Sequence, residues 1–139
     1  MVRSIDEVMS SPVRTVSPDT SLHEAAEIMR DADVGDVIVT RDNRIMGILT
    51  DRDIVVRCVA EGGDPREHTA QEVCSSEVAT IPPQSGIRDA VDMMRTNALR
   101  RLPVVDGDRV VGMVTMGDLA QAIDDKSALS DVSAADPNR

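Results

Sequence analysis

The chain has 139 residues, of which 41% are apolar, and this is enough to form one domain-sized hydrophobic core. It contains no Phe, Tyr or Trp, so a planar ligand must be held by aliphatic side chains and backbone groups. The formal net charge of −10 argues against binding to nucleic acids or anionic membranes, because such binding relies on Lys and Arg to neutralise phosphates.

The N-terminal stretch MVRSIDEVMS places Asp6 and Glu7 where a signal peptide needs an apolar run, and no segment approaches the roughly 18 apolar residues of a membrane span. We therefore expect a soluble, cytoplasmic protein. Cys58 and Cys74 are too few for a disulfide framework and are interpreted as small buried residues. The alternative is a three-ligand metal site with His68 in the inter-repeat linker, although the spacing matches no zinc pattern.

The first predicted elements run from a helical turn to a β-hairpin. Ser4 lies three residues before Glu7, a capping-box spacing that starts a helical turn, and VRTVSP is a short extended segment closed by proline. Ser21 and Glu24 then cap an amphipathic helix. Its apolar residues recur at i, i+3, i+4 and i+7, at Leu22, Ala25, Ala26 and Met29. The segments DVIV and RIMGIL flank TRDN, which predicts two strands joined by a tight turn, and the helix DIVVRCVA follows.

The second half of the chain repeats this series. After a shift of 65 positions, residues 4–53 align with residues 69–118 without a gap, and fifteen positions are identical. The second amphipathic helix carries the matching apolar residues Ile87, Ala90, Val91 and Met94. A gapless repeat of this length predicts two structural units that bury their apolar faces on each other.

After its helical turn, each repeat reads β-α-β-β-α, an α/β (α+β) fold. The helix between the first two strands requires a small mixed sheet with helices on one face. We predict repeat 1 over residues 1–60, a polar linker over 61–68, repeat 2 over 69–125 and a disordered tail over 126–139. The last helix of repeat 1 is apolar over most of its circumference. Its excess apolar face predicts a homodimer through Ile54, Val55, Val56 and Val59.

One short motif occurs twice, as GILTDRD in repeat 1 and GMVTMGD in repeat 2. It places Thr50 and Thr115 at strand ends, with Asp53 and Asp118 just inside the following helices. In one interpretation each pair only caps its helix. In the other, the carboxylate accepts hydrogen bonds from both hydroxyls of a ribose, while the Thr hydroxyl and free N–H groups face a phosphate. Capping alone is sufficient to explain the pair.

The whole arrangement is more specific than the motif. Two gapless copies of helical turn, β, α, then VGDVIV or RRLPVVDGDRVVGMVT and the Thr-x-x-Asp motif, resemble a tandem pair of cystathionine-β-synthase (CBS) domains, called a Bateman module. The resemblance covers about residues 5–123 and is closest to bacterial proteins made only of two CBS domains. It implies repeats packed about a pseudo-twofold axis, a disc-like homodimer, and clefts between the repeats that bind AMP, ADP, ATP or S-adenosylmethionine.

The resemblance also implies which residues contact such a ligand. The ribose acid of repeat 1 is Asp53, beside Thr50, and that of repeat 2 is Asp118, beside Thr115. The segments that line the rest of the first site are Thr15, Val16, Ser17, Asp36, Val37 and Ile38. Those of the second site are Thr80, Ile81, Pro82, Arg101, Leu102 and Pro103. Repeat 2 keeps the family's proline at Pro103 where repeat 1 has Ile38, so we expect the second site to bind more readily.

Phosphate groups need a local positive charge, for which Arg52, Arg100 and Arg101 are candidates, although each is equally well explained as a solvated surface residue. No nucleophile with a base, metal cluster or pair of tuned carboxylates converges in either repeat, so we expect no enzyme and no required cofactor. The sequence thus predicts a regulatory module that binds an adenine nucleotide. The alternative is a ligand-free dimeric scaffold whose motifs only cap helices.

Overall fold

The computed structural model describes residues 3–11 and 13–126, so the predicted tail, apart from Lys126, lies outside the described residues. These residues form a mixed α+β fold, as predicted, with five strands rather than the six expected from two β-α-β-β-α repeats. They divide into two compact units, which we name after their longer helices. The α1 unit holds residues 13–79 and 107–110, and the α4 unit holds residues 3–11, 80–106 and 111–126. In this part of the chain, no helix combines the length and apolar character needed to cross a bilayer.

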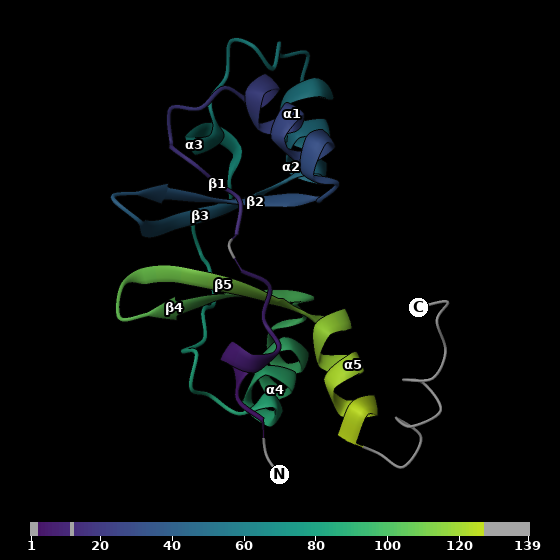
Figure 1. The fold of residues 1–139 in the computed structure, drawn as a ribbon. Helices are drawn as coiled ribbons and strands as arrows, with labels where there is room; N and C mark the ends of the chain where they lie inside the picture. The colour runs from purple at the N-terminus through teal and green to yellow at the C-terminus, as the bar shows by residue number, and fades with distance from the viewer. Residues whose placement is uncertain (1–2, 12, 127–139) are drawn as a thin grey trace. The chain divides into compact units, whose positions relative to one another are not determined.

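The α1 unit is a small sheet covered by helices on one face (Figure 1). β1 (Thr15–Val16) pairs in parallel with β2 (Asp36–Arg41), which pairs antiparallel with β3 (Arg44–Thr50). The helices are α1 (Leu22–Ala32), α2 (Asp51–Ile54), its π-helical continuation η2 (Val55–Val59), and α3 (Ala70–Val73). One core joins all of these elements and contains Val16, Leu22, Ala25, Met29, Val37, Val39, Leu49, Ile54, Cys58, Ala70 and Val73.

The α4 unit repeats the plan with a weaker first strand. β4 (Arg101–Asp106) neighbours β5 (Arg109–Thr115), and Ile81 adds a single parallel bridge to Val104. α4 (Ile87–Asn97), α5 (Met116–Lys126) and the 3-10 helix η1 (Ile5–Glu7) complete it.

The predicted amphipathic helices are confirmed. α1 buries Leu22, Ala25 and Met29, and the first turn is capped as expected, because the Ser21 hydroxyl accepts the N–H of Glu24 at 3.0 Å. α4 buries the matching residues Ile87, Ala90 and Met94. The spacing predicted both faces because residues three and four apart lie on the same side of a helix.

The first hairpin also forms as predicted. Asp42 and Asn43, between β2 and β3, both have positive φ angles, of 55° and 64°. A two-residue turn of this kind matches the right-handed twist of the flanking strands, and Asp and Asn tolerate the left-handed conformation better than most residues.

The short helical turns differ from the sequence expectation, because each belongs to the unit built by the other repeat. η1 docks in the α4 unit, where the Ile5 N–H donates to the carbonyl of Ser85 at 2.8 Å. α3 docks in the α1 unit, where the Ala70 N–H donates to the carbonyl of Thr20 at 2.8 Å. In Figure 1 the purple η1 accordingly lies next to α4 rather than next to α1. The repeats in sequence and the compact units in space therefore have different boundaries.

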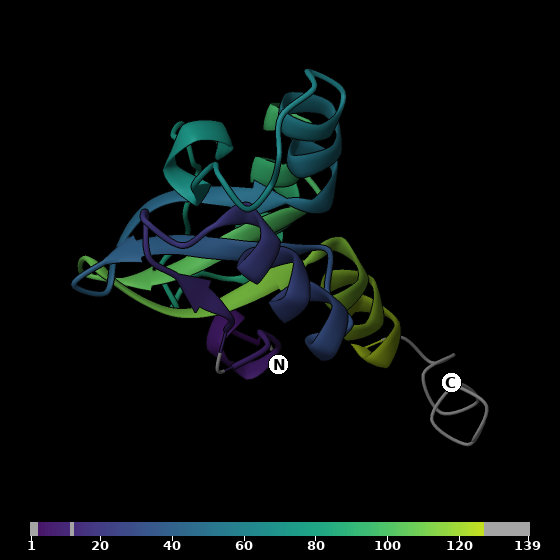
Figure 2. The ribbon, with the colours of Figure 1, turned by 90° about the horizontal axis from the view of Figure 1, so that it is seen from above.

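The linker has a structural role in the α1 unit. In Figure 2 it returns from the end of η2 to α3 within that unit. Its carbonyl groups at His68 and Pro65 accept the N–H groups of Leu22 and His23, at 2.9 and 3.1 Å. These two donors belong to the first turn of α1, which has no acceptor of its own for them, so the linker satisfies that end of the helix.

Candidate functional site

The Thr-x-x-Asp motif of the α1 unit forms a reciprocal cap at the junction of β3 and α2. The Thr50 hydroxyl accepts the N–H of Asp53 at 3.0 Å, and the Asp53 Oδ2 accepts the N–H of Thr50 at 2.9 Å. Both side chains are half-buried. The capping interpretation of this pair is therefore confirmed in the geometry.

The motif of the α4 unit has the same geometry. The Thr115 hydroxyl accepts the N–H of Asp118 at 3.0 Å, and the Asp118 Oδ2 accepts the N–H of Thr115 at 2.9 Å. One such bond leaves most of the acceptor capacity of a carboxylate unused, because its two oxygens offer about four lone-pair sites. The cap and a ribose contact are thus compatible in the same side chain.

The expectation of free N–H groups for a phosphate is wrong for α2. Its first three N–H groups, of Asp51, Arg52 and Asp53, are bound by the Gly35 carbonyl, the Asp51 Oδ1 and the Thr50 hydroxyl, at 3.0, 2.7 and 3.0 Å. These donors satisfy local acceptors, so an incoming phosphate must displace one of those bonds.

In the first turn of α5, two backbone N–H groups are likewise already bound to local acceptors. The Met116 N–H donates to the Arg100 carbonyl at 2.7 Å, and the Asp118 N–H is bound by Thr115. The structural reason is shared by both units, because the residue just before β2 (Gly35) or β4 (Arg100) accepts the first N–H of the helix that follows the hairpin.

The residues predicted for the first site come together in the α1 unit. The β-sheet register places Thr15 beside Ile38 and Asp36 opposite Thr50. Ser17 follows β1 in a turn, where its N–H donates to the Thr20 hydroxyl at 3.1 Å. Several of these side chains are buried and can offer only backbone groups to a ligand; they are Val16, Val37 and Ile38.

The residues predicted for the second site come together in the α4 unit. The Ile81 N–H donates to the Pro103 carbonyl at 3.1 Å, which places Thr80 to Pro82 along β4. The buried side chains in this set are Ile81, Leu102 and Pro103, while Thr80 and Arg101 are half-buried and Pro82 is exposed. Arg52 and Arg100, the candidates for phosphate contact, are both exposed.

A polar cavity of about 240 Å³ lies beside Asp118, between η1 and α5. Its lining consists of Arg3, Glu7, Val8, Asp118, Gln121 and Ala122. Hydrogen bonds from Ser4, with a smaller contribution from the charge of Arg3, hold the pKa of Glu7 below its ordinary value. Sequence reasoning missed Arg3 and Gln121 and assigned Glu7 only a capping role, because nothing in the pattern shows that η1 packs beside α5.

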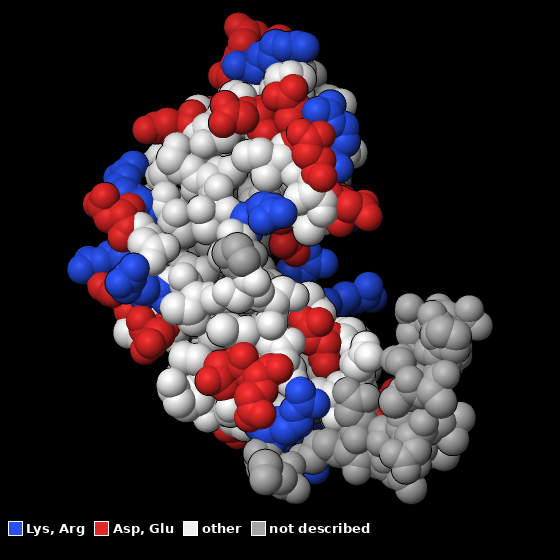
Figure 3. Space-filling model, viewed as in Figure 1, with Lys and Arg blue, Asp and Glu red and all other residues white. Residues whose placement is uncertain are grey.

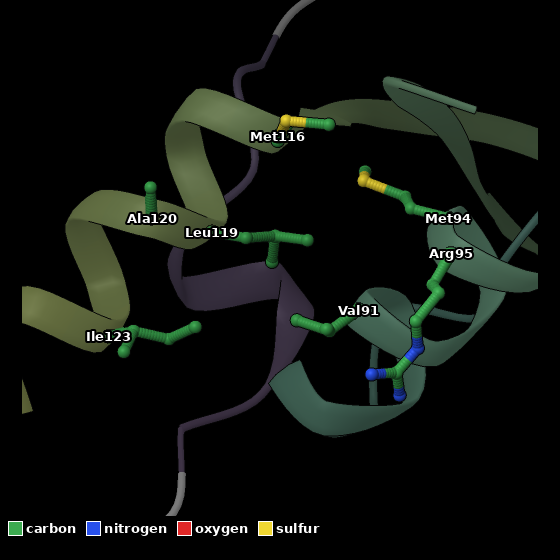
Figure 4. Close-up of a pocket in the computed structure, with 7 residues that line it drawn as sticks. All are labelled: Val91, Met94, Arg95, Met116, Leu119, Ala120 and Ile123. Carbon is green, nitrogen blue, oxygen red and sulfur yellow. The ribbon is translucent and has the colours of Figure 1, made fainter. Parts of the chain in front are cut away.

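A second cavity, of about 280 Å³, is an apolar groove between α4 and α5 (Figure 4). The figure shows Leu119 and Met116 of α5 directed towards Val91 and Met94 of α4. Met116 and Ile123 are 51% and 49% exposed. The groove has too few polar groups to orient a polar ligand, and its exposed rim resembles a protein contact surface.

The cysteines do not assemble a metal site within the described residues, where no three His, Cys, Asp or Glu side chains group suitably. Cys58 is 3% exposed and belongs to the core of the α1 unit. Burial, and next the charge of Asp53, raises the pKa of the Cys74 thiol. The His68 imidazole contacts Glu72 at 2.9 Å instead.

The fold, with its two capped strand-to-helix junctions, defines a tandem-repeat module. The CBS domain family model matches residues 3–59 and 70–125, so the chain belongs to the CBS domain family and carries a pair of these domains. The chain is 39% identical over 117 residues to the CBS domain-containing protein YhcV of Bacillus subtilis, which covers 84% of this chain and 83% of that protein.

Solved structures show the same fold. Hypoxic response protein I, described with two coordinated zinc ions, has a TM-score of 0.77 and 33% identity, over 86% of this chain and 98% of that one. The CBS domain pair of protein MJ0100, in complex with 5′-methylthioadenosine and S-adenosyl-L-methionine, has a TM-score of 0.80 and 24% identity. That match covers 91% of this chain and all of the other.

Proposed function

We propose that this protein is a regulatory module, not an enzyme, that binds an adenosine-containing ligand through the acids of its Thr-x-x-Asp motifs. The observation that carries the proposal is the reciprocal bonding of Thr115 and Asp118, which holds a half-buried carboxylate rigidly at a strand-to-helix junction. The complex of MJ0100 with two adenosine compounds supports this ligand class for a protein of the same fold.

The proposed contact uses the remaining acceptor sites of Asp118. A ribose presents two neighbouring hydroxyl groups, and a carboxylate accepts from both without giving up its bond to Thr115. The backbone along Ile81 and β4 then flanks the base. Because the chain has no aromatic residue, the base is held by aliphatic groups and backbone alone.

The second candidate function is a ligand-free scaffold, favoured by the observation that both acids already cap their helices. The two candidates differ in what Asp118→Asn does. Asn keeps an oxygen for the cap, so stability changes little in either case. If Asp118 binds ribose, the amide accepts from one hydroxyl only, and affinity falls by roughly ten- to a hundredfold.

The experiment is calorimetric titration of the purified protein with AMP, ATP, 5′-methylthioadenosine and S-adenosylmethionine. Asp118→Asn should weaken binding far more than it lowers the melting temperature, and more than Asp53→Asn does, because only the second repeat has the family's proline, Pro103. Asp106→Asn, on an exposed residue at the end of β4, is the matched control for loss of one charge. Absence of binding at millimolar concentration would leave the scaffold function.

We also propose that the module is a homodimer. Val55, Val56 and Val59 are 57%, 44% and 52% exposed, an unusual degree of exposure for adjacent valines on one helix. Ile54 does not belong to this surface as the sequence had suggested, since it is 7% exposed and packs in the core of the α1 unit. The apolar groove of the α4 unit is a further surface that a second copy can cover (Figure 4).

A further inference from the structure

The polar cavity beside Asp118 is too small for a whole ligand. Its volume of about 240 Å³ falls below the range of roughly 300–1,000 Å³ typical of small-molecule sites. Because Asp118 lines both this cavity and the proposed ribose position, the cavity is placed to accommodate one substituent of a bound nucleoside. Its lining then decides which substituent is tolerated.

The charges in the lining are unbalanced. Arg3 supplies one positive charge, while Glu7 and Asp118 supply two negative charges. Hydrogen bonds from Ser4, and to a smaller degree the charge of Arg3, lower the pKa of Glu7, so this carboxyl is ionised at neutral pH. The lining therefore holds one more carboxylate than cation, and this environment disfavours a further negative charge.

The neighbouring helix end compensates only partly for this imbalance. A helix N-terminus attracts anions through its unbonded N–H groups. In α5, the N–H groups of Met116 and Asp118 already donate to the Arg100 carbonyl and the Thr115 hydroxyl. Figure 3 shows acidic and basic side chains interspersed on the visible surface of each unit.

We infer that this cavity makes the Thr115–Asp118 site selective for adenosine compounds whose 5′ substituent is neutral or positively charged, such as a thioether or a sulfonium, over nucleoside phosphates. This inference rests on the proposed function, because it assumes that Asp118 binds ribose. The inference goes beyond the proposed function because it assigns the choice between ligands to Glu7, which lies on η1 and has no part in the Thr-x-x-Asp motif.

The test compares 5′-methylthioadenosine with AMP, which differ at the 5′ position and by the phosphate charge. In calorimetric titrations of the full chain at low salt, we expect 5′-methylthioadenosine to bind at least about tenfold more tightly than AMP. The ratio should shrink as salt is added, because ions screen the repulsion of the phosphate.

The variant Glu7→Gln isolates the charge. Gln preserves the capping-box position, so η1 is retained. It should reduce the preference for 5′-methylthioadenosine by roughly threefold or more, because the cavity loses one negative charge. Glu72→Gln is the matched control, since Glu72 holds the equivalent cap on Thr69 in the α1 unit and is not part of the lining of the cavity beside Asp118. It should leave the ratio unchanged.

The possible failures are distinguishable. If AMP binds as tightly as 5′-methylthioadenosine or more tightly, or if Glu7→Gln and Glu72→Gln act alike, the charge selection is overturned while the proposed function stands. If no adenosine compound binds the unmodified protein, both are overturned.

Discussion

Gly47 and Gly112 show at the scale of single residues why each motif begins with glycine. A Cβ on Gly47 would lie 2.5 Å from the carbonyl oxygen of Ser75, and one on Gly112 would collide with Met9 and lie 3.1 Å from the carbonyl oxygen of Ser10. In each unit the chain following the docked helical turn crosses directly over the strand. Glycine is needed there for close approach and not for an unusual φ angle.

Gly47→Ala should therefore destabilise the protein by about 1–3 kcal/mol, because the contact is with backbone that cannot rotate away. Urea denaturation measures the change. Gly112→Ala should cost less, since its nearest neighbour is the flexible end of Met9. Gly117→Ala, in the first turn of α5 with only an ordinary contact at 3.7 Å, is the control and should be neutral or stabilising. Equal effects at all three positions would contradict the crossing argument.

The His68–Glu72 pair predicts a weak pH dependence of stability. The hydrogen bond to Glu72 raises the pKa of His68, and the same bond lowers that of Glu72. Because the pKa of His68 is raised, its contribution to stability is fully present below pH 6.5 and is lost as the pH rises through the folded-state pKa. Because the pKa of Glu72 is lowered, its contribution is present above pH 4.5 and is lost as the pH falls through the folded-state pKa. Glu67 and Asp64 act on His68 in the same direction as Glu72.

The melting temperature should thus fall between pH 5.5 and pH 8.5, and part of this fall should disappear in His68→Gln. The effect is small because the pair is exposed and screened by solvent. A variant whose pH dependence matches that of the unmodified protein would show that the pair contributes nothing to folding.

At the scale of elements, the short helical turns matter more than their length suggests. η1 has three residues, yet its Ile5 is fully buried in the α4 unit. α3 has four residues and contributes Ala70 and Val73 to the core of the α1 unit. Each turn therefore completes a core that is otherwise built from the other repeat.

Ile5→Ala should destabilise the protein by about 2–5 kcal/mol, the range for truncating a fully buried aliphatic side chain. Chemical denaturation followed by circular dichroism provides the measurement. Val34→Ala, at a 39% exposed position, is the control and should cost well under half as much. If Ile5→Ala proved as mild as the control, η1 would not be part of the cooperative fold.

At the scale of the whole molecule, the exposed valines of η2 predict association. Sedimentation should report a particle of about twice the 15.0 kDa chain mass. Val59→Glu should shift the equilibrium towards monomer, because it places a charge in an apolar contact. Val34→Glu makes the same change on a different exposed valine and should leave the dimer intact. A strict monomer at micromolar concentration would refute the proposal.

The sequence by itself determined the repeat, the helices α1 and α4, the hairpins and the capped Thr-x-x-Asp junctions. These features depend on local spacing: 3.6-residue periodicity, turn residues such as Asp42 and Asn43, and a hydroxyl three residues before an acid. Three features were decided by the tertiary structure alone: the docking of η1 and α3 each in the unit built by the other repeat, the burial of Ile54, and the cavity beside Asp118. Each of these depends on contacts between segments far apart in the chain, and two repeats with the same pattern contain no local signal for which sheet each helical turn will cover.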